Sequence, residues 1–473
     1  MILSSLCLIA PELVMFIVVL GLFAASALGH KSPVPVSKWL PVASVAVLAV
    51  SAAGLCASGD LAAGSYRVDM LSQFFKLAVA FGFTFVVLNA LRQPTLEHGE
   101  RSDYFLFMGL ASWGLMLLAS AAELVTMYLA LELSSYSLYV LIPIRGKTRE
   151  SAEAGAKYIL FGAAATALSL YGLSHIIASQ HTTYVAQLVT ADWSFASNPE
   201  GVLGLALFLC GMFYKLALFP FHFWCPDVYQ GTSNETAAFV ATLPKLGAVV
   251  ILIRLAAGLK PELEITHFLA GLALLSMTFG NLCALGQKDL KRLLGFSSVA
   301  HAGYIIVGLV SGTPKGVAAA AFYGLAYVIM NLLCFWVVSR VSSDGRNLEL
   351  KDLNGLYKRS PYLAFALCVG AFALVGLPPT IGFMGKLFLI SSAWDHGYNW
   401  LVIGLVLNSA IAIYYYLNMV RHAYTEEDAP AIPADTSTFA SAGAMVLAGL
   451  ALILGIVPAF VFEFAVKAAE AMY

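Results

Sequence analysis

Four charged side chains lie inside long apolar stretches of this sequence: Glu132, Lys215, Lys245 and Lys386. On insertion scales, one charge at the centre of a membrane helix costs roughly 2.5–3.5 kcal/mol. Four such charges together cost on the order of 10 kcal/mol, which is comparable with the whole net stability of a domain. Stability alone therefore does not explain them, and their types indicate proton chemistry.

Lysine has a property that suits a proton carrier. Burial disfavours the ammonium form and lowers the pKa of a lysine, whereas a nearby carboxylate raises it. A lysine beside a carboxylate that can move is therefore tunable, and Glu132 and Lys215 are the natural pair. Prolines also stand near each buried lysine, where a loosened backbone can admit water: Pro220 after Lys215, Pro244 before Lys245, and Pro378 and Pro379 before Lys386.

A lysine in a membrane helix has a second interpretation. Its stem can lie in lipid while its ammonium group reaches the interface, and this alternative stays open for Lys215, Lys245 and Lys386. For Lys76 we favour either this interfacial placement or pairing with Glu12. Arg254 stands near the end of its apolar stretch and is expected at the membrane interface.

Two histidines accompany these charges. His301 stands about eight residues inside an apolar stretch, and the pKa of histidine lies nearest neutrality, so a role in proton transfer is one interpretation. A hydrogen-bonded structural histidine is the other. His222 stands beside Pro220 and is expected in a loop or cap at a helix break.

Composition identifies the class of protein that must position these residues. The 473 residues are 60% hydrophobic and 11% charged, which predicts an all-α polytopic membrane protein with about 14 spans. The first apolar stretch is expected as a retained helix, because no Lys or Arg precedes it as in a signal peptide. The expected spans are 4–29, 38–57, 67–91, 103–121, 124–144, 154–178, 201–221, 236–258, 264–286, 293–312, 316–340, 361–390, 399–420 and 439–466.

Basic residues divide the expected loops into two groups. Most of the 26 Lys and Arg residues follow odd-numbered spans, among them Lys31, Arg145, Lys147, Lys288 and Arg346, while the other loops hold little beyond Arg67, Lys260 and Lys315. By the positive-inside rule, the first group faces the cytoplasm. With an even number of spans, both termini are expected on the outer, periplasmic side.

Two expected spans are interrupted by proline, the seventh at Pro220 and the twelfth at Pro378 and Pro379. Proline removes a backbone hydrogen bond and clashes with the preceding turn. In lipid such a break is tolerated only against protein or a hydrated cavity. Two broken helices five spans apart indicate repeated transport units, with ordinary proline kinks as the alternative.

Redox and nucleotide motifs are absent from the sequence. There is no GxGxxG after a strand, no Walker lysine loop and no cysteine cluster for iron–sulfur or haem. The seven cysteines form no CxxC pair and are expected as small buried side chains. We therefore expect this chain to bind no cofactor or metal, and electrons of any coupled reaction to travel elsewhere.

Five stretches carry a resemblance to a known family: FYKLALFPFHFWCPDVYQG, LPKLGAV, KDLKRLLGFSSVAHAGY, LKDLNGLYKRSP and GLPPTIGFMGKLFL. They resemble the proton-translocating, antiporter-like membrane subunits of respiratory complex I, the NADH-quinone oxidoreductase. PDVYQG and the modest length are similar to the subunit N branch of that family. The stretch QGTSNETAAF is more polar than expected after PDVYQG, and no role is assigned to it.

The resemblance implies two inverted five-helix repeats, each with one proline-broken helix. It implies N-terminal helices in 1–100, a first repeat in 101–260, a second repeat in 261–425, and a loop and last helix in 426–473. It also implies a chain of protonatable groups at the middle of the membrane. By motif, the family positions fall on Glu132, Lys215, Lys245, His301 and Lys386.

The implied function is that of a membrane subunit of a proton-translocating NADH-quinone oxidoreductase. Other subunits would hold NADH, FMN, iron–sulfur clusters and quinone, while this chain would translocate protons. Expected partners are other membrane subunits and the bilayer, without nucleic acid, in the bacterial inner membrane. The alternatives are a subunit of a multi-subunit monovalent cation/proton antiporter, a non-transporting assembly subunit and, least favoured, a solute permease.

Overall fold

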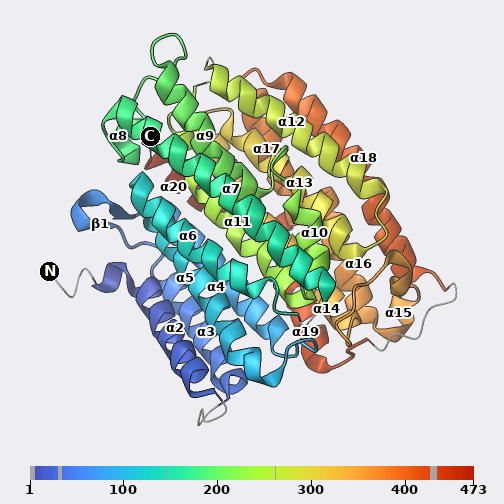
Figure 1. Ribbon diagram of the computed structural model, residues 1–473. Coiled ribbons are helices and arrows are strands. Elements are labelled where there is room, and N and C mark those ends of the chain that lie inside the picture. Colours follow the sequence, from blue (N-terminus) through green and yellow to red (C-terminus); the bar gives the residue numbers. More distant parts are fainter. Residues whose placement is uncertain (1–5, 30–34, 146–147, 261–262, 427–433, 473) are drawn as a thin grey trace.

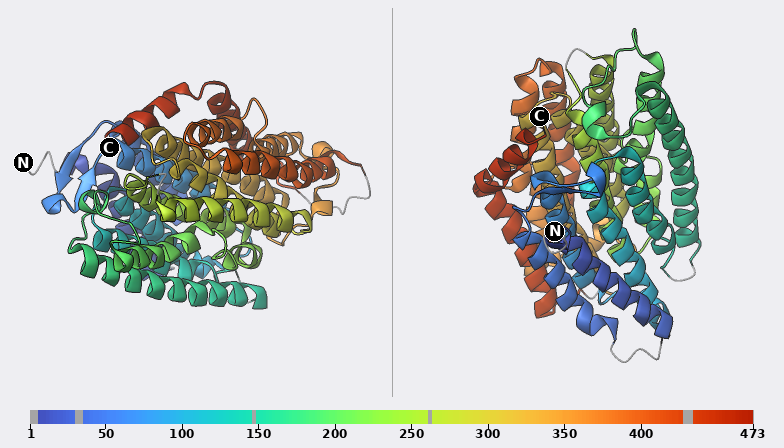
Figure 2. Two further views of the ribbon diagram at one scale, coloured as in Figure 1. Left: turned by 90° about the horizontal axis from the view of Figure 1, so that it is seen from above. Right: turned by 90° about the vertical axis from the view of Figure 1, so that its left-hand side faces the viewer.

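A computed structural model describes residues 6–29, 35–145, 148–260, 263–426 and 434–472 of the chain, so Lys31 and Lys147 lie outside the described residues. The described helices form one bundle of long, roughly antiparallel rods (Figures 1 and 2). They are α2 (Ala10–Leu28), α3 (Val36–Ala53), α4 (Met70–Ala90), α5 (Arg101–Ser120), α6 (Leu124–Leu141), α7 (Arg149–Gln180), α8 (Val185–Leu188), α9 (Pro199–Leu216), α10 (Trp224–Gly231), α11 (Asn234–Ala256), α12 (Glu264–Leu285), α13 (Leu290–Leu309), α14 (Pro314–Val341), α15 (Leu356–Arg359), α16 (Pro361–Val375), α17 (Ile381–Trp394), α18 (Asn399–Tyr424), α19 (Thr438–Ile456) and α20 (Ala459–Glu470).

The helices confirm the expected membrane-spanning architecture. Within the described residues, 13 helices are long and apolar enough to cross a membrane. The two shorter apolar helices α16 and α17 together form the twelfth expected span, which completes the expected number. Because each repeat contains an odd number of spans, the second repeat starts from the opposite end of the bundle and is inverted relative to the first.

The two ends of the bundle differ in structure. We call one the hairpin end, because β1 (Gly59–Leu61) and β2 (Tyr66–Val68) form a short antiparallel hairpin there. Isolated bridges join Tyr66 to Ala121 and Glu123 to Tyr184 at this end. Both chain termini lie toward it in Figure 1.

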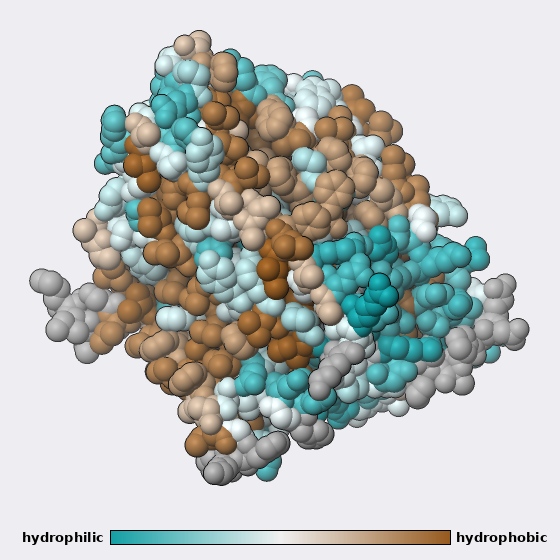
Figure 3. All heavy atoms as spheres, viewed as in Figure 1, coloured by the Kyte–Doolittle hydropathy of each residue, from teal (hydrophilic) through white to brown (hydrophobic). Residues whose placement is uncertain are grey.

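We call the opposite end the basic end, because it carries Arg145, Lys288 and Arg346 in its loops. An isolated bridge between Asp289 and Glu349 ties two of these loops together. Figure 3 shows hydrophilic residues gathered toward this end near α15, and largely hydrophobic residues along much of the rest of this face. The structure thus separates the two loop groups as the charge pattern predicted.

Helix α11 forms the centre of the bundle together with α14. The most apolar window of α11 is buried completely and that of α14 almost completely. Protein surrounds α11, because α4, α5, α9, α13 and α14 all pack against it. Lys245 on α11 therefore lies in protein rather than in lipid.

The two proline-broken helices end in the same local structure. The first half-helix, α9, ends with Ala217 in the left-handed region, and Leu218 N–H donates to Phe213 O. The second, α16, ends with left-handed Gly376, and Leu377 N–H donates to Phe372 O. This six-to-one hydrogen bond is typical of a Schellman stop. The expected breaks are confirmed, and α10 and α17 begin after each break.

The last expected span, 439–466, is not one continuous helix. Helix α19 ends at Ile456 and α20 begins at Ala459, after a turn at Val457 and Pro458. Proline cannot donate the hydrogen bond that would continue the helix, and its ring clashes with the preceding turn. Stacking of Phe464 on Phe74 then holds α20 against the start of α4, near the hairpin end.

Asp435 fastens the segment before α19 to the bundle. Its carboxylate lies 3.1 Å from Arg92 Nη1 and 3.7 Å from Arg340 Nη1. Burial alone would raise the pKa of Asp435, but hydrogen bonds from Ser437 and the two guanidinium charges outweigh it and hold that pKa below its usual range.

We expect Asp435→Asn to lower the free energy of unfolding by at most about 1 kcal/mol near neutral pH, because the pair is partly exposed. A lowered carboxyl pKa stabilises the fold above the unfolded-state value and loses that effect as the pH falls through the folded-state value. Unfolding at several pH values should therefore show the difference between the two proteins vanish in acid. A difference that grows in acid would contradict this account.

Candidate functional site

Glu132 and Lys215 line one small pocket between α6, α7 and α9. Thr166 of α7 donates a hydrogen bond of 3.1 Å to Glu132 Oε1, while Glu132 Oε2 has no hydrogen-bond partner. Among the described residues, neither charge forms an ion pair within 4.0 Å. The expected pair is therefore brought into one pocket without direct contact, which leaves both charges free to respond to movement or water.

Close helix packing fixes the position of Lys215 relative to α7. Gly172 and Gly204 stand where α7 and α9 cross, and a Cβ atom on Gly172 would come within 2.3 Å of Phe208 N. Small residues let membrane helices approach this closely. The ammonium of Lys215 lies 5.6 Å from the ring centroid of Tyr158 and 5.3 Å from that of Tyr214. Its Nζ is buried without a hydrogen-bond partner.

Lys245 stands inside α11, one residue after Pro244, and its helix continues through that proline. Its Nζ donates a 2.5 Å hydrogen bond to Ser298 Oγ of α13. Ser298 is in turn hydrogen-bonded to the hydroxyls of Tyr327 and Tyr229. The ammonium of Lys245 is thus joined to a chain of hydroxyl groups and to no carboxylate among the described residues.

His301 lies one turn after Ser298 on α13 and is 1% exposed. Its Nδ1 is hydrogen-bonded to the Tyr323 hydroxyl at 2.8 Å, and its Nε2 to the Tyr416 hydroxyl at 3.4 Å. Both ring nitrogens are therefore partnered. This geometry agrees with a structural histidine and also with one that exchanges protons along hydroxyl groups, so the sequence alternatives both remain.

Lys386 of α17 points back at the end of the other half of its broken helix. Its Nζ donates to Val375 O at 2.8 Å and to Ser409 Oγ at 3.0 Å. The carbonyl end of a helix carries partial negative charge, so the end of α16 stabilises this ammonium. The Nζ also lies 4.3 Å from the ring centroid of Tyr304, which places Lys386 inside protein rather than at an interface.

A set of buried hydroxyl and amide side chains fills the space between Lys245 and Lys386, and sequence reasoning assigned it no role. Asn281 donates to Tyr304 OH and accepts from Tyr415 OH. The further members are Tyr229, Ser297, Ser298, Tyr323, Tyr327 and Tyr416. In the sequence, tyrosines in apolar helices cannot be distinguished from ordinary core residues. Only the polar residues of the SSVAHAGY stretch indicated that a functional group of side chains lies here.

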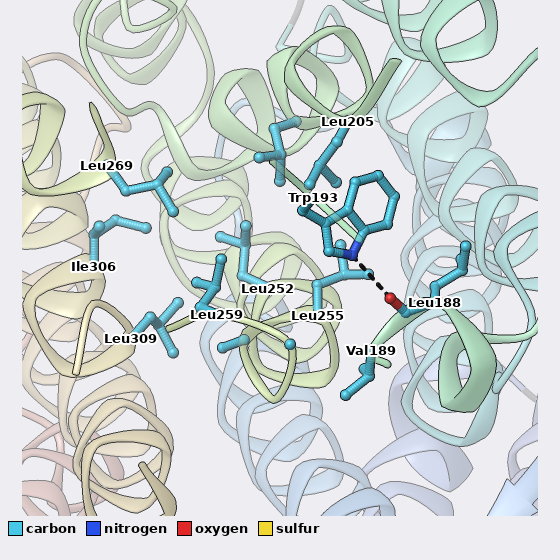
Figure 4. A pocket seen from close by; sticks show the side chains of 13 residues that line it. Leu188, Val189, Trp193, Leu205, Leu252, Leu255, Leu259, Leu269, Ile306 and Leu309 are labelled. Carbon is cyan, nitrogen blue, oxygen red and sulfur yellow. Dashed lines mark hydrogen bonds between the residues drawn. The ribbon is translucent and has the colours of Figure 1, made fainter. Parts of the chain in front are cut away.

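The cavity in Figure 4 lies on the other side of Lys245, toward the hairpin end. Leu252 and Leu255 of α11 line it with Ile306 and Leu309 of α13. The ring N–H of Trp193 is already used, because it donates to Leu188 O at 2.8 Å. An apolar lining offers water no hydrogen-bond partners, so this cavity provides no polar route toward Lys245.

Two further charged pairs, largely buried, lie near the hairpin end. Lys76 Nζ lies 2.6 Å from Glu12 Oε1, and Lys76 is fully buried. The expected pairing is confirmed, and the interfacial alternative is wrong because the ammonium group does not reach the surface. Arg254 forms a two-point contact with Asp69 at 3.1 and 3.2 Å.

Other expectations have mixed outcomes. His222 lies in the turn between α9 and α10, as expected. Cys7 and Cys56 are exposed, so the expectation of buried cysteines is wrong for these two, which lie near the ends of the first spans. Across the described part of the chain, His, Cys, Asp and Glu side chains form no group of three or more that could hold a metal ion.

Residues 121–412 match the transmembrane family described as "NADH:quinone oxidoreductase/Mrp antiporter, TM". The chain belongs to this family. The match contains both broken helices and all five buried residues of the candidate site. The antiporter-like fold expected from the sequence is therefore confirmed.

Named relatives of the family cover almost the whole chain. The chain is 58% identical over 465 residues to "NADH-quinone oxidoreductase subunit N 2" of Solidesulfovibrio magneticus, covering 98% of both chains. It is 44% identical over 459 residues to the protein of the same name in Opitutus terrae, covering 96% of this chain and 95% of the relative.

Solved structures show the same fold. A chain of respiratory complex I from Thermus thermophilus with bound aureothin is 32% identical, with a TM-score of 0.84 over 96% of this chain and 99% of that chain. A chain of the Mrp complex from Dietzia sp. is 21% identical, with a TM-score of 0.84 over 100% and 98%. At that lower identity, the second likeness shows the fold alone.

Proposed function

We propose that this chain is a proton-translocating membrane subunit of a complex I-type NADH-quinone oxidoreductase. One observation carries the proposal: Lys215, Lys245 and Lys386 are all buried, and none forms an ion pair among the described residues. A buried, uncompensated charge is costly, whereas a lysine that gains and loses a proton needs a site without a fixed carboxylate. The relatives named as subunit N support the choice of complex.

The mechanism begins at Glu132. Redox energy released in other subunits moves Glu132 relative to Lys215, and the change in their electrostatic interaction makes Lys215 take up or release a proton. No hydrogen bond among the described residues joins Lys215 to Lys245, so water must carry the proton between them. Loosened backbone at the break after α9 gives that water a place.

The second half of the route uses hydroxyl groups. A proton leaves the Lys245 ammonium and passes by way of Ser298 and the tyrosine hydroxyls, with His301 or water, to the neutral amine of Lys386. Each hydroxyl accepts one proton and gives up another, so the chain of hydroxyls is unchanged overall. Lys386 then releases its proton to the outer side.

Orientation, domains and partners belong to the same proposal. We assign the basic end to the cytoplasm by the positive-inside rule, which puts both termini on the periplasmic side of a bacterial inner membrane.

The first repeat occupies 101–260 and the second 261–425. Other membrane subunits of the complex are the partners, and NADH, FMN, iron–sulfur clusters and quinone belong to subunits outside this chain.

Glu132→Gln tests the first step. The amide keeps the shape and the hydrogen bond from Thr166 but carries no charge. General acid–base groups contribute roughly 10²–10⁴-fold to rates, so we expect proton translocation by the assembled complex to fall by at least about tenfold. Glu463→Gln, an exposed carboxyl of α20, is the matched control. Full pumping in Glu132→Gln would overturn the proposed role.

A monovalent cation/proton antiporter subunit is the competing function, because the Mrp chain shares the fold. Vesicles that lack the redox arm of the complex distinguish the two. We expect addition of Na⁺ or K⁺ to leave their pH gradient unchanged. Collapse of the gradient that depends on the added cation would favour the antiporter.

A further inference from the structure

Glu235 is a buried carboxylate that the proposed route does not use. It lies in the first turn of α11, within the QGTSNETAAF stretch, and is 2% exposed. Its Oε2 has no hydrogen-bond partner, and within the described residues no cation lies within 4.0 Å of it. A buried carboxylate without a cation partner is costly unless it is neutralised or hydrated, so a purely structural role does not explain it.

Charged and titratable groups from three helices and one loop lie around Glu235. Lys291 of α13, Arg340 of α14 and Arg145 of the loop after α6 act on it as positive charges, and the Tyr104 hydroxyl of α5 lies nearby. Two neighbouring polar atoms, Asn234 Oδ1 and Arg340 Nε, are also buried without partners. Buried polar atoms without protein partners are the places where proteins hold water.

A polar pocket at the basic end adjoins this cluster, because Arg145 donates hydrogen bonds to Gln230 O and Gly231 O of the pocket lining. The pocket is lined by Asp227, Arg292, Lys157, Gln230 and Gly231, with further polar residues. The residue after Gly231 connects the pocket to the cluster, because Lys291 Nζ donates a 2.5 Å hydrogen bond to Thr232 O. Polar groups therefore continue from the pocket to the cluster around the buried carboxylate.

The geometry of two helices leads from this cluster to Lys245. Glu235 and Thr242 are seven residues apart on one face of α11. Lys245 follows three residues later, turned by about 60° from Thr242 and about 15 Å from Glu235 along the axis. Lys291 and Ser298 are likewise seven residues apart on α13. Since Ser298 accepts from Lys245, both helices point from the cluster to the same lysine.

We propose that Glu235, supported by Lys291, is a further protonatable site that takes up protons at the basic end and delivers them to Lys245. The apolar lining of the cavity beyond Lys245 agrees with this, because that cavity offers a proton no polar groups. The carboxylate takes up a solvent proton that water in the polar pocket carries to it, and becomes a neutral acid. It then gives that proton to bound water and on to the neutral amine of Lys245. No redox step occurs. The inference rests on the proposed function.

The test compares Glu235→Gln with the unsubstituted protein in the assembled complex in sealed vesicles. Gln keeps the shape but cannot carry a proton. We expect NADH-driven proton uptake to fall about tenfold, less than the full general acid–base effect because water carries part of the flux. Glu150→Gln, an exposed carboxyl beside the polar pocket, should pump normally.

Lys245→Ala in the same vesicles separates the role of Glu235 in proton uptake from the proposed function of the chain. Normal uptake in Glu235→Gln with lost uptake in Lys245→Ala would overturn this inference and leave the proposed function standing. Normal uptake in both would overturn the proposed function. If Glu235→Gln does not assemble, Glu235→Asp keeps the acid but shortens its reach: slowed uptake in a fully assembled complex supports the inference, and an unchanged rate overturns it.

An infrared measurement adds a readout that a structural role would not move. During turnover, protonation of a carboxylate produces a carboxylic acid C=O band in the difference spectrum. We expect Glu235→Gln to remove one such band while Glu150→Gln keeps it. Retention of every band in Glu235→Gln would show that Glu235 does not change its protonation state and would overturn the inference.

Discussion

Lys245→Ala is expected to reduce proton translocation by the assembled complex to the level of passive leak. Lys245 lies at the centre of the bundle, and its ammonium makes the hydrogen bond that begins the hydroxyl chain. Removing it deletes both the proton carrier and the donor to Ser298. Because general acid–base groups contribute roughly 10²–10⁴-fold, we expect a loss well above tenfold in the initial rate of pH change.

The matched control for this variant is Lys315→Ala. Lys315 is exposed in the first turn of α14 and has no ion-pair partner among the described residues. We expect it to pump normally. A non-transporting assembly subunit predicts instead that both variants pump normally once the amount of assembled complex is equalised by immunoblot.

Lys76→Ala is expected to cause the largest loss of stability of any single change considered for this chain. Lys76 and Glu12 form an ion pair whose side chains are 0% and 4% exposed. The Tyr66 hydroxyl also donates to Glu12. Removing one partner of a buried ion pair strands the other charge and costs about 3–5 kcal/mol. Unfolding in mixed micelles should show a loss of this size.

The double variant Glu12→Gln, Lys76→Met tests the physical reason. With both charges removed, no stranded charge remains, and replacing a buried pair by uncharged groups is often neutral. We expect most of the stability lost in Lys76→Ala to return. If the double variant is as unstable as Lys76→Ala, packing rather than the unpaired charge controls this site.

Much of the architecture could be predicted because the bilayer imposes strong rules on sequence. The thickness of the bilayer's hydrocarbon core sets the length of the helices. The alternation of basic and non-basic loops indicates which loops lie on the same side of the membrane. Proline marked the broken helices, since Pro220 and Pro379 cannot take part in a regular ladder. The break between α19 and α20 at Pro458 was not predicted. The apolar stretch continues across this proline, and hydropathy does not show where a helix changes direction.

The site was predictable only where a charge stands against an apolar background. Lys215, Lys245 and Lys386 are conspicuous for this reason. Ser298 and Tyr327 are not, because hydroxyl side chains in apolar helices are common, and only three-dimensional contact joins them to Lys245. The burial of Glu235 was not predicted, because this residue lies at the start of a helix. The helix dipole stabilises an acidic residue there, and such a residue is usually at the surface.

Lys245→Arg distinguishes a lysine that carries protons from one that supplies only a positive charge. Arginine keeps a positive charge and can reach Ser298, but its guanidinium cannot give up a proton in a protein. The measurement is the initial rate of NADH-driven acidification by the assembled complex in sealed vesicles, normalised to complex content. We expect Lys245→Arg to fail to pump, as Lys245→Ala does. Pumping by Lys245→Arg at the unsubstituted rate would contradict proton transfer by Lys245.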